Sequence, residues 1–296
     1  RLIDFDNNTV GKLNYTLNDT KYDPEVITSS SYDLFVRMIR DLKITKDKVT
    51  TLGVSIVGTV NPKEGIVIFS PQMCWKNISL AKQLEEKFNL PVVLENDVKS
   101  AIYKEYTLNK TNQIPNLAYL NIGSGVGLAF MSKGKIVRGR SNAAGEIGHI
   151  TVKPNGNLCD CGRKGCLNTY LAEKEILKQA KAQDSSITSL EQIIAKFHNN
   201  IPWANELIHE ICTYIAIALN NTLCSYNPDK IIVGGSLVSN HPELLEKALS
   251  LDGYFYDLIR TDTIVKPAST HGDESVIGAA LLAQALHIKN LIHQLE

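Results

Sequence analysis

Apolar and polar residues follow strand and helix patterns in turn along the N-terminal third of the chain. Residues 2–5, the polar turn 6–8 and residues 9–16 predict a β-hairpin. Apolar residues then recur at helical spacing over 32–42, and the apolar run 52–57 predicts a short buried strand. This part of the chain is therefore expected to mix helix and strand.

The next stretch reads as one strand–helix–strand step. Ser79 is placed to cap a helix whose apolar face carries Leu80, Leu84 and Phe88. Asn89 and a following proline are expected to end that helix, and residues 92–94 predict the next strand. Such a step is typical of a parallel sheet with helices on its face.

The middle of the chain predicts consecutive strands over 117–122, 126–131 and 135–137, joined by Gly-rich or Lys-Gly turns. From 172 to 221 the pattern is mainly helical. A strand at 230–233, followed by Gly234-Gly235-Ser236, predicts a second sheet covered by these helices. A last helix over 275–286 begins with small residues that allow close backbone approach.

Length and charge narrow the function classes. A chain of 296 residues with 44% hydrophobic content is long enough for about two domains. Its 31 basic and 31 acidic residues provide no broad basic surface, so this segment is not expected to bind nucleic acid by itself. The apolar stretch 211–219 is too short to span a bilayer, and no secretory signal is visible at the first residues, so we expect a cytoplasmic protein.

Three of the six cysteines crowd into eight residues, which is typical of a metal site in a reducing compartment. His149, Cys159, Cys161 and Cys166 form a closed tetrahedral set suited to structural Zn²⁺. A disulfide within this loop is the alternative, disfavoured by the odd number of cysteines. A catalytic zinc is disfavoured because all four positions are filled by protein.

The run Ala144-Gly145-Glu146-Ile147-Gly148-His149, followed by the C-x-C-G-x-x-G-C cluster, resembles the signature of the ROK family of sugar kinases and sugar-responsive repressors. The resemblance extends from Leu2 to the final helix. It implies an α/β, two-lobed actin-like ATPase (ribonuclease H-like) fold, here with the N-terminal edge strand missing. The smaller lobe would comprise 1–97 with the C-terminal helix 276–296, and the larger lobe 98–275 with the zinc loop 149–166.

The same resemblance implies a sugar site. Glu146 and His149 would hydrogen-bond sugar hydroxyls, with zinc on one ring nitrogen fixing the aim of the other. Asn96 and Asp97 follow a strand at its carboxyl end, where ligands bind in α/β sheets, and in kinases of the family this Asp is the base. The plainer alternatives are that Glu146 caps a turn and that Asn96-Asp97 forms an Asx turn leading into a helix.

A glycine-rich stretch resembles the second phosphate loop of the family, whose backbone amides approach phosphate oxygens. Its residues are Gly123, Ser124, Gly125 and Gly127. A hairpin turn between two strands explains the same residues equally well. The segments 234–236 and 275–280 similarly resemble the adenosine side of the family site.

Three departures from the family pattern qualify the resemblance. The Asp-x-Gly-Gly-Thr loop that grips phosphates in kinases does not occur, because the sequence starts at the hairpin that follows it. Asn168 stands where sugar kinases usually carry a Glu, and Gln72 replaces an Asn. Val98-Lys99 replaces small residues, and the lysine is expected to crowd or repel part of the site. The sugar-binding residues expected are Gln72, Asn96, Asp97, Glu146, His149 and Asn168.

These departures favour one of two hypotheses. The first is the sugar-inducer-binding domain of a ROK-type transcriptional repressor that controls carbohydrate metabolism genes, and is not itself an enzyme. Its helix-turn-helix would lie upstream and contact operator DNA, and the family implies a homodimer or a dimer of dimers. The alternative is an ATP-dependent sugar kinase that uses ATP and Mg²⁺, with Asp97 as base. Structural Zn²⁺ is expected in both.

Overall fold

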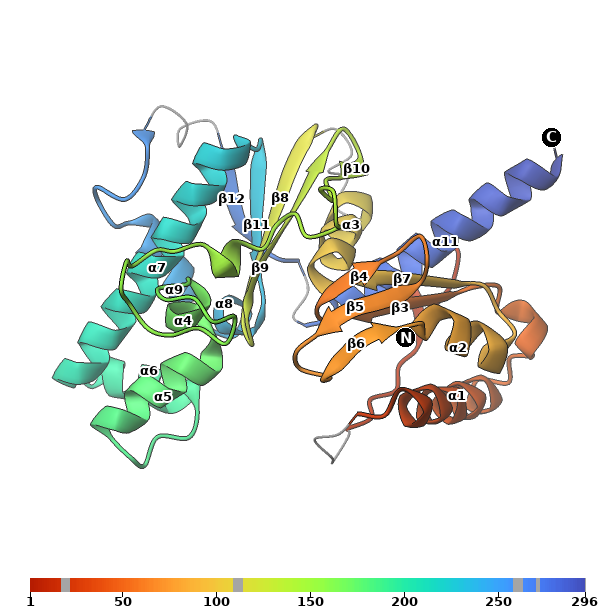
Figure 1. Ribbon diagram of the computed structural model, residues 1–296, viewed down its shortest axis with the longest axis horizontal. Helices are drawn as coiled ribbons and strands as arrows, with labels where there is room; N and C mark the ends of the chain where they lie inside the picture. Colours follow the sequence, from red (N-terminus) through yellow and green to blue (C-terminus); the bar gives the residue numbers. More distant parts are fainter. Residues whose placement is uncertain (17–21, 109–113, 258–262, 270–271, 296) are drawn as a thin grey trace. The chain divides into compact units, whose positions relative to one another are not determined.

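The computed structural model describes residues 1–16, 22–108, 114–257, 263–269 and 272–295. The chain forms two compact units (Figure 1). Unit 1 contains Arg1–Asn112, Arg138–Ala143 and Asp273–Glu296, and unit 2 contains Gln113–Val137 and Ala144–Gly272. The boundary expected at residue 97 differs from this division. Helix α3 (Asp97–Leu108) belongs to unit 1, because it packs along α11 (Glu274–Leu295).

Unit 1 is built from short sheets. The predicted hairpin is present as β1 (Leu2–Ile3) and β2 (Thr9–Gly11), and β3 (Leu52–Ile56) pairs in parallel with β7 (Val92–Asn96). Three further strands form an antiparallel sheet that the sequence pattern did not predict. They are β4 (Thr59–Asn61), β5 (Ile66–Ser70) and β6 (Trp75–Ile78).

Helix α1 (Pro24–Asp41) begins eight residues before its predicted start at 32. The reason lies in its first turn, where the Asp23 side chain accepts a hydrogen bond from the Glu25 amide and a proline occupies the first helical position. Helix α2 (Leu80–Phe88) ends at a left-handed Asn89, as predicted. Ser79 precedes α2, but it makes no side-chain capping bond within the described residues, so that prediction was wrong.

The core of unit 1 is largely aromatic and aliphatic. Phe35 of α1 and Phe88 of α2 have ring centroids 5.3 Å apart, and Tyr32 meets Phe88 edge-on at 5.2 Å. Trp75 is buried against the same cluster. These contacts hold α1 and α2 beside the strands whose ends carry the candidate site. A single-turn 3₁₀ helix, η1 (Lys46–Lys48), connects α1 to β3.

Helix α11 is seated against α3 and β3 by two glycines (Figure 1). A Cβ on Gly278 would lie 1.8 Å from the carbonyl oxygen of Ser100 in α3. A Cβ on Gly53 of β3 would lie 2.1 Å from the carbonyl oxygen of Ala279. The close backbone approach predicted from the small residues at the start of this helix is therefore confirmed.

Unit 2 contains a five-stranded sheet in the order β10-β9-β8-β11-β12. Strands β8, β11 and β12 are parallel, and β9 and β10 complete an antiparallel meander. The expectation of a second sheet was wrong, because β11 pairs with β8 and joins the first sheet. The bounds are β8 Asn116–Ile122, β9 Val126–Ser132, β10 Lys135–Ile136, β11 Lys230–Gly234 and β12 Ile264–Pro267.

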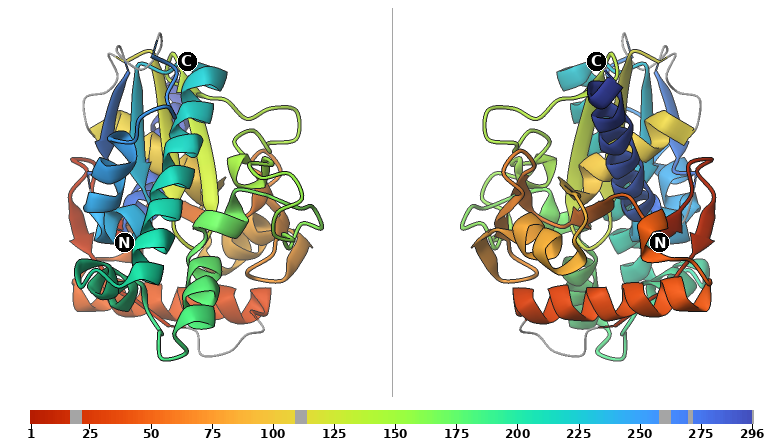
Figure 2. Two further views of the ribbon diagram at one scale, coloured as in Figure 1. Left: turned by 90° about the vertical axis from the view of Figure 1, so that its left-hand side faces the viewer. Right: turned by 90° about the vertical axis from the view of Figure 1, so that its right-hand side faces the viewer.

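Helices cover the sheet of unit 2, and the longest of them, α7, lies along one face of that sheet (Figure 2). The buried side chains of α7 join the hydrophobic core of unit 2. Both α7 and α11 have the length and composition of a membrane span, and the most apolar window of α7 is 61% buried. Core helices share these properties, and both helices pack against other elements of their units. The helices are α4 Asn168–Leu171, α5 Glu173–Gln183, α6 Leu190–His198, α7 Pro202–Tyr226, α8 Ser236–Asn240 and α9 Pro242–Leu249.

Candidate functional site

The four predicted metal ligands come together in unit 2. His149 ends the short helix η3 (Ile147–His149), and the three cysteines lie on the loop that follows. An isolated bridge between Thr151 and Cys166 closes the base of this loop. Gly165 is required there, since its φ is +74° and a Cβ would lie 1.8 Å from the carbonyl oxygen of Lys153.

The donor atoms have the spacing of a tetrahedral metal site. All four lie within 4.8 Å of one another, and each of the six cysteines is a free thiol. The sulfurs of Cys161 and Cys166 are 3.6 Å apart, and Cys159 Sγ is 3.8 Å from His149 Nδ1. Zinc–sulfur bonds of about 2.3 Å place two tetrahedral sulfurs about 3.8 Å apart. The residues therefore fit a zinc ion, with Nδ1 as the nearest histidine donor.

The thiols of this loop have opposed acidities. The backbone amide of Arg163, with help from its side chain and the neighbouring thiols, lowers the pKa of Cys161 to about 6. Burial, followed by hydrogen bonds and charges from the other two thiols, raises the pKa of Cys166 to about 12. A metal-free loop at neutral pH would thus hold a thiolate and a protonated thiol side by side, and a metal would displace the remaining proton.

Glu146 and Asn168 flank the predicted metal ligands in sequence, because Glu146 precedes η3 and Asn168 is the first residue of α4. Glu146 precedes η3 and, among the described residues, makes no side-chain capping bond there, so turn capping does not account for it. A Cβ on Gly148 would lie 2.5 Å from Asn168 Oδ1, which places Asn168 against η3. Asn168 Oδ1 accepts a hydrogen bond of 2.7 Å from the Val126 amide. Asn168 therefore ties the zinc loop to the glycine-rich turn.

The glycine-rich stretch Gly123–Gly127 contains the turn 123–125 between β8 and β9 and the first two residues of β9, and a 3.0 Å bond from the Gly123 amide to the Gly125 carbonyl closes the turn. A residue that the sequence analysis missed lies beside it. The Glu173 amide donates to the Gly123 carbonyl at 3.0 Å, and the Glu173 carboxylate accepts a short hydrogen bond from the Ser236 hydroxyl. Glu173 carried no local signal, because its partners come from distant parts of the sequence.

In unit 1, Asn96 and Asp97 stand at the carboxyl end of β7, as predicted. The Asn96 side chain accepts a 3.0 Å bond from the Lys99 amide, which is the Asx-type arrangement considered as the plainer alternative. Its Nδ2 donates to Asp97 Oδ1 at 2.8 Å and to the Gly58 carbonyl at 3.0 Å. These bonds aim the Asp97 carboxylate.

Lys99 is buried, and its ammonium donates to the Asn142 carbonyl at 2.9 Å. Gln72 lies on the exposed turn between β5 and β6. The expected sugar-binding residues thus form two groups. Gln72, Asn96 and Asp97 belong to unit 1, and Glu146, His149 and Asn168 belong to unit 2.

Comparison with known proteins identifies relatives of two kinds. The model of the ROK family matches residues 9–286. The chain is 28% identical over 227 residues to the xylose repressor of Bacillus subtilis (strain 168), covering 77% of this chain and 59% of the repressor. It is 25% identical over 276 residues to the glucokinase of Halalkalibacterium halodurans, covering 88% of this chain and 83% of the glucokinase.

A solved structure agrees with these matches. The ROK family transcriptional regulator described as a homolog of the E. coli MLC protein superposes with a TM-score of 0.78 at 23% identity, covering 90% of this chain and 70% of the regulator. At that identity the likeness shows the fold, which is the predicted actin-like ATPase fold. The chain spans about three fifths of the length of the xylose repressors it matches.

Proposed function

Because this chain belongs to the ROK family, we propose that it is the sugar-sensing part of a transcriptional repressor. Its ligand would be a small aldose, with xylose the first to test because xylose repressors are among its relatives. Operator DNA would be contacted by a helix-turn-helix outside this sequence. We also propose that the protein is cytoplasmic and assembles as a homodimer or a dimer of dimers.

The observation that carries the repressor proposal is the position of Glu173. A nucleotide phosphate needs the backbone amides of a glycine-rich turn and a locally positive field. At Gly123–Gly127, the neighbouring hydroxyl of Ser236 is instead bonded to the Glu173 carboxylate, and the Glu173 amide is bonded to the Gly123 carbonyl. A fixed negative charge beside the turn opposes phosphate binding and supports a binding protein over a kinase.

Sugar binding is supported by the chemistry of the two groups of residues. Asp97 and Glu146 offer carboxylate oxygens, which accept hydrogen bonds from hydroxyls, and Asn168 offers an amide. His149 uses Nδ1 toward the thiols, which leaves Nε2 to face a ligand. Asn96 holds Asp97 through its amide. We propose that each of these two groups of residues contributes to sugar binding, with Gln72 contributing from the β5–β6 turn.

Structural zinc is the second part of the proposal. When bound by His149, Cys159, Cys161 and Cys166, zinc would supply folding energy to the loop and fix the tautomer of His149. The loop is tied to α5 by an ion pair between Asp160 and Lys174, which holds the pKa of Asp160 below its usual range. The residues of the chain then orient Nε2 of His149 and the carboxylate of Glu146.

Titration calorimetry of the zinc-loaded chain against xylose, glucose and N-acetylmannosamine tests the sugar proposal. We expect one of these sugars to bind, and Asp97→Asn and Glu146→Gln each to weaken its binding by about tenfold or more, since each removes a charged hydrogen-bond acceptor. Glu175→Gln is the matched control, because Glu175 is a half-buried carboxylate of α5 that forms ion pairs with Lys174 and Lys178 of its own helix. No binding to any sugar of the panel by the wild-type chain contradicts the proposal.

A sugar kinase remains the second candidate because Asp97 stands at the end of β7 as a catalytic base would. ADP release from ATP and Mg²⁺ in the presence of each sugar separates the two functions. We expect no release from the wild-type chain and a gain of nucleotide binding in Glu173→Ala, but not in Glu175→Ala. Sugar-dependent ADP release by the wild-type chain would establish the kinase instead.

A further inference from the structure

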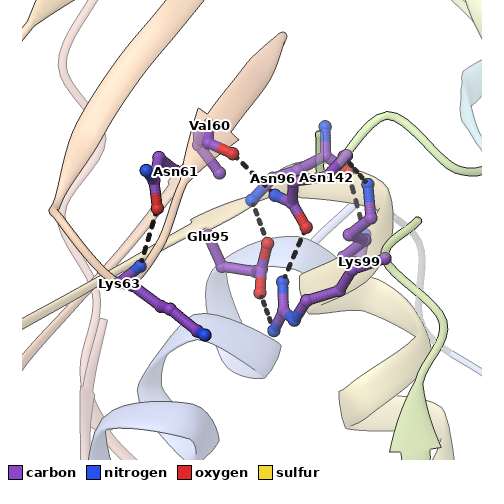
Figure 3. Close-up of polar contacts among 8 residues, drawn as sticks. Val60, Asn61, Lys63, Glu95, Asn96, Lys99 and Asn142 are labelled. Carbon is purple, nitrogen blue, oxygen red and sulfur yellow. Dashed lines mark hydrogen bonds and ion pairs between the residues drawn. The ribbon is translucent and has the colours of Figure 1, made fainter. Parts of the chain in front are cut away.

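A short polar segment that is distant from β7 in sequence contacts the carboxyl end of β7 in unit 1. Arg138–Ala143 belongs to unit 1, although the residues on both sides of it belong to unit 2. Figure 3 shows the contacts of its residue Asn142 with Lys99 and Val60, beside Glu95 and Asn96. We call Arg138–Ala143 the strap.

The first line of contacts runs through Glu95. Arg138 Nη2 forms an ion pair with Glu95 Oε2 at 2.5 Å, and Glu95 Oε1 accepts a 2.9 Å hydrogen bond from the Asn96 amide. The Glu95 side chain is only 2% exposed. A buried carboxylate depends on its partners, because it has lost its water. Arg138 therefore stabilises the carboxylate that holds the backbone of Asn96.

The second line runs through Lys99. Its ammonium donates to the Asn142 carbonyl at 2.9 Å, and its backbone amide donates to Asn96 Oδ1 at 3.0 Å (Figure 3). Asn142 itself is fixed at both ends of its side chain. It accepts a 3.1 Å bond from Arg138 and donates a 2.7 Å bond to the Val60 carbonyl.

The backbone of Asn142 suits this role. Its φ is +60°, in the left-handed region that asparagine tolerates better than most residues. Glycine would also adopt this φ, but it would lose both side-chain bonds. The two lines of contacts together hold the main chain and the side chain of Asn96, and Asn96 in turn donates to Asp97 Oδ1 at 2.8 Å.

We propose that Arg138 and Asn142 are positioning residues, which set the affinity for sugar by holding Asn96 and Asp97 without touching the ligand themselves. This inference rests on the proposed sugar-binding function. The contacts of the strap described here all lie within unit 1, so the proposed effect acts on Asn96 and Asp97.

The test compares Arg138→Met with two further variants and one control. Arg138→Lys keeps the positive charge, and the double variant Glu95→Gln/Arg138→Met also removes the buried negative charge with which Arg138 is paired. The control is Arg140→Met, an exposed arginine of the same strap. Two measurements are made on the zinc-loaded chain. They are sugar affinity by calorimetry and hydrogen exchange of the backbone amides at 95–99.

We expect Arg138→Met to weaken sugar binding about tenfold or more and to accelerate amide exchange at Asn96 and Lys99, since it leaves a buried carboxylate without its cation. Arg138→Lys should restore part of both losses. Glu95→Gln should make the Arg138 substitution nearly neutral, a non-additivity that a general loss of packing would not produce. Arg140→Met should match the wild type.

Unchanged affinity and exchange in Arg138→Met, or equal losses in Arg140→Met, would overturn the positioning role. Additive losses in the double variant would also overturn it, because Arg138 would then act by a route other than Glu95. The exchange measurement separates this inference from the proposed function. If the wild type binds no sugar, the function fails, and exchange at 95–99 alone decides whether the strap holds Asn96.

Discussion

The substitution Gly278→Ala tests how α11 is seated on α3. The added methyl carbon would lie 1.8 Å from the Ser100 carbonyl oxygen and 2.4 Å from its carbonyl carbon. The shortest separation that Cβ atoms show is 3.0 Å, so the two helices must separate by at least about 1.2 Å, the difference between these values. The obstacle is backbone, which cannot rotate aside as a side chain can.

The expected loss of stability follows from two opposed effects. Overpacking of this kind costs about 1–3 kcal/mol, and a backbone clash belongs at the upper end of that range. Alanine in place of glycine inside a helix returns about 1 kcal/mol. The net destabilisation is therefore about 2 kcal/mol, which lowers the melting temperature by about 4–8 °C for a unit of this size.

The two tryptophans of the chain allow unit 1 to be followed alone. Trp75 is buried in the core of unit 1, and Trp203 lies on α7 of unit 2. In a Trp203→Phe background, the fluorescence of Trp75 reports thermal unfolding of unit 1. Val276→Ala is the matched control, because Val276 is an exposed residue of the same helix. We expect it to change stability by less than about 0.5 kcal/mol.

The reasoning is refuted if Gly278→Ala melts with the parent protein, since α11 and α3 would then tolerate a separation that the packing forbids. An equal drop in Val276→Ala would also refute it, because the loss would reflect the helix itself and not its contact with Ser100.

Three further outcomes are expected. Cys161→Ser should lower zinc affinity by more than about 100-fold in a competition assay with a chelating dye, whereas Cys74→Ser should not, because Cys161 belongs to the ligand cluster and Cys74 does not. Zinc binding near neutral pH should release protons, since the raised pKa of Cys166 keeps that thiol protonated until the metal binds, and zinc affinity should therefore rise with pH. Calorimetry in two buffers of different ionisation enthalpy measures the number of protons released, and a heat of binding that is the same in both buffers would contradict this prediction. Asn168→Asp should weaken the bond from the Val126 amide little while adding negative charge near the glycine-rich turn, so sugar affinity should change while zinc content, measured by atomic emission, stays the same.

Features that depend on neighbours in sequence could be predicted. The metal cluster was recognisable because three of its ligands lie within eight residues and the fourth ends the preceding short helix. Strands β8 and β9 were predicted because a short glycine-rich turn joins two apolar runs. The end of α2 followed from Asn89, whose left-handed conformation is a common way to stop a helix.

Features that depend on distant partners could not be predicted. Strand β11 joins β8 more than a hundred residues away, and no local pattern distinguishes this from a separate sheet. The role of Glu173 depends on Ser236. Lys99 was expected to crowd the sugar site, but its ammonium bonds to the carbonyl of Asn142, a contact that only the folded chain reveals.

The position of α11 in the sequence also determines the order in which the two units can be completed during synthesis on the ribosome. This helix packs on α3 and β3, yet the whole of unit 2 lies in the sequence between α3 and α11. At about 5–20 residues per second, translation of that stretch takes roughly ten to thirty seconds. During this interval the nascent chain contains β3 and α3 without the helix that packs on them, so unit 1 is begun first but can be completed only after all of unit 2 has been synthesised.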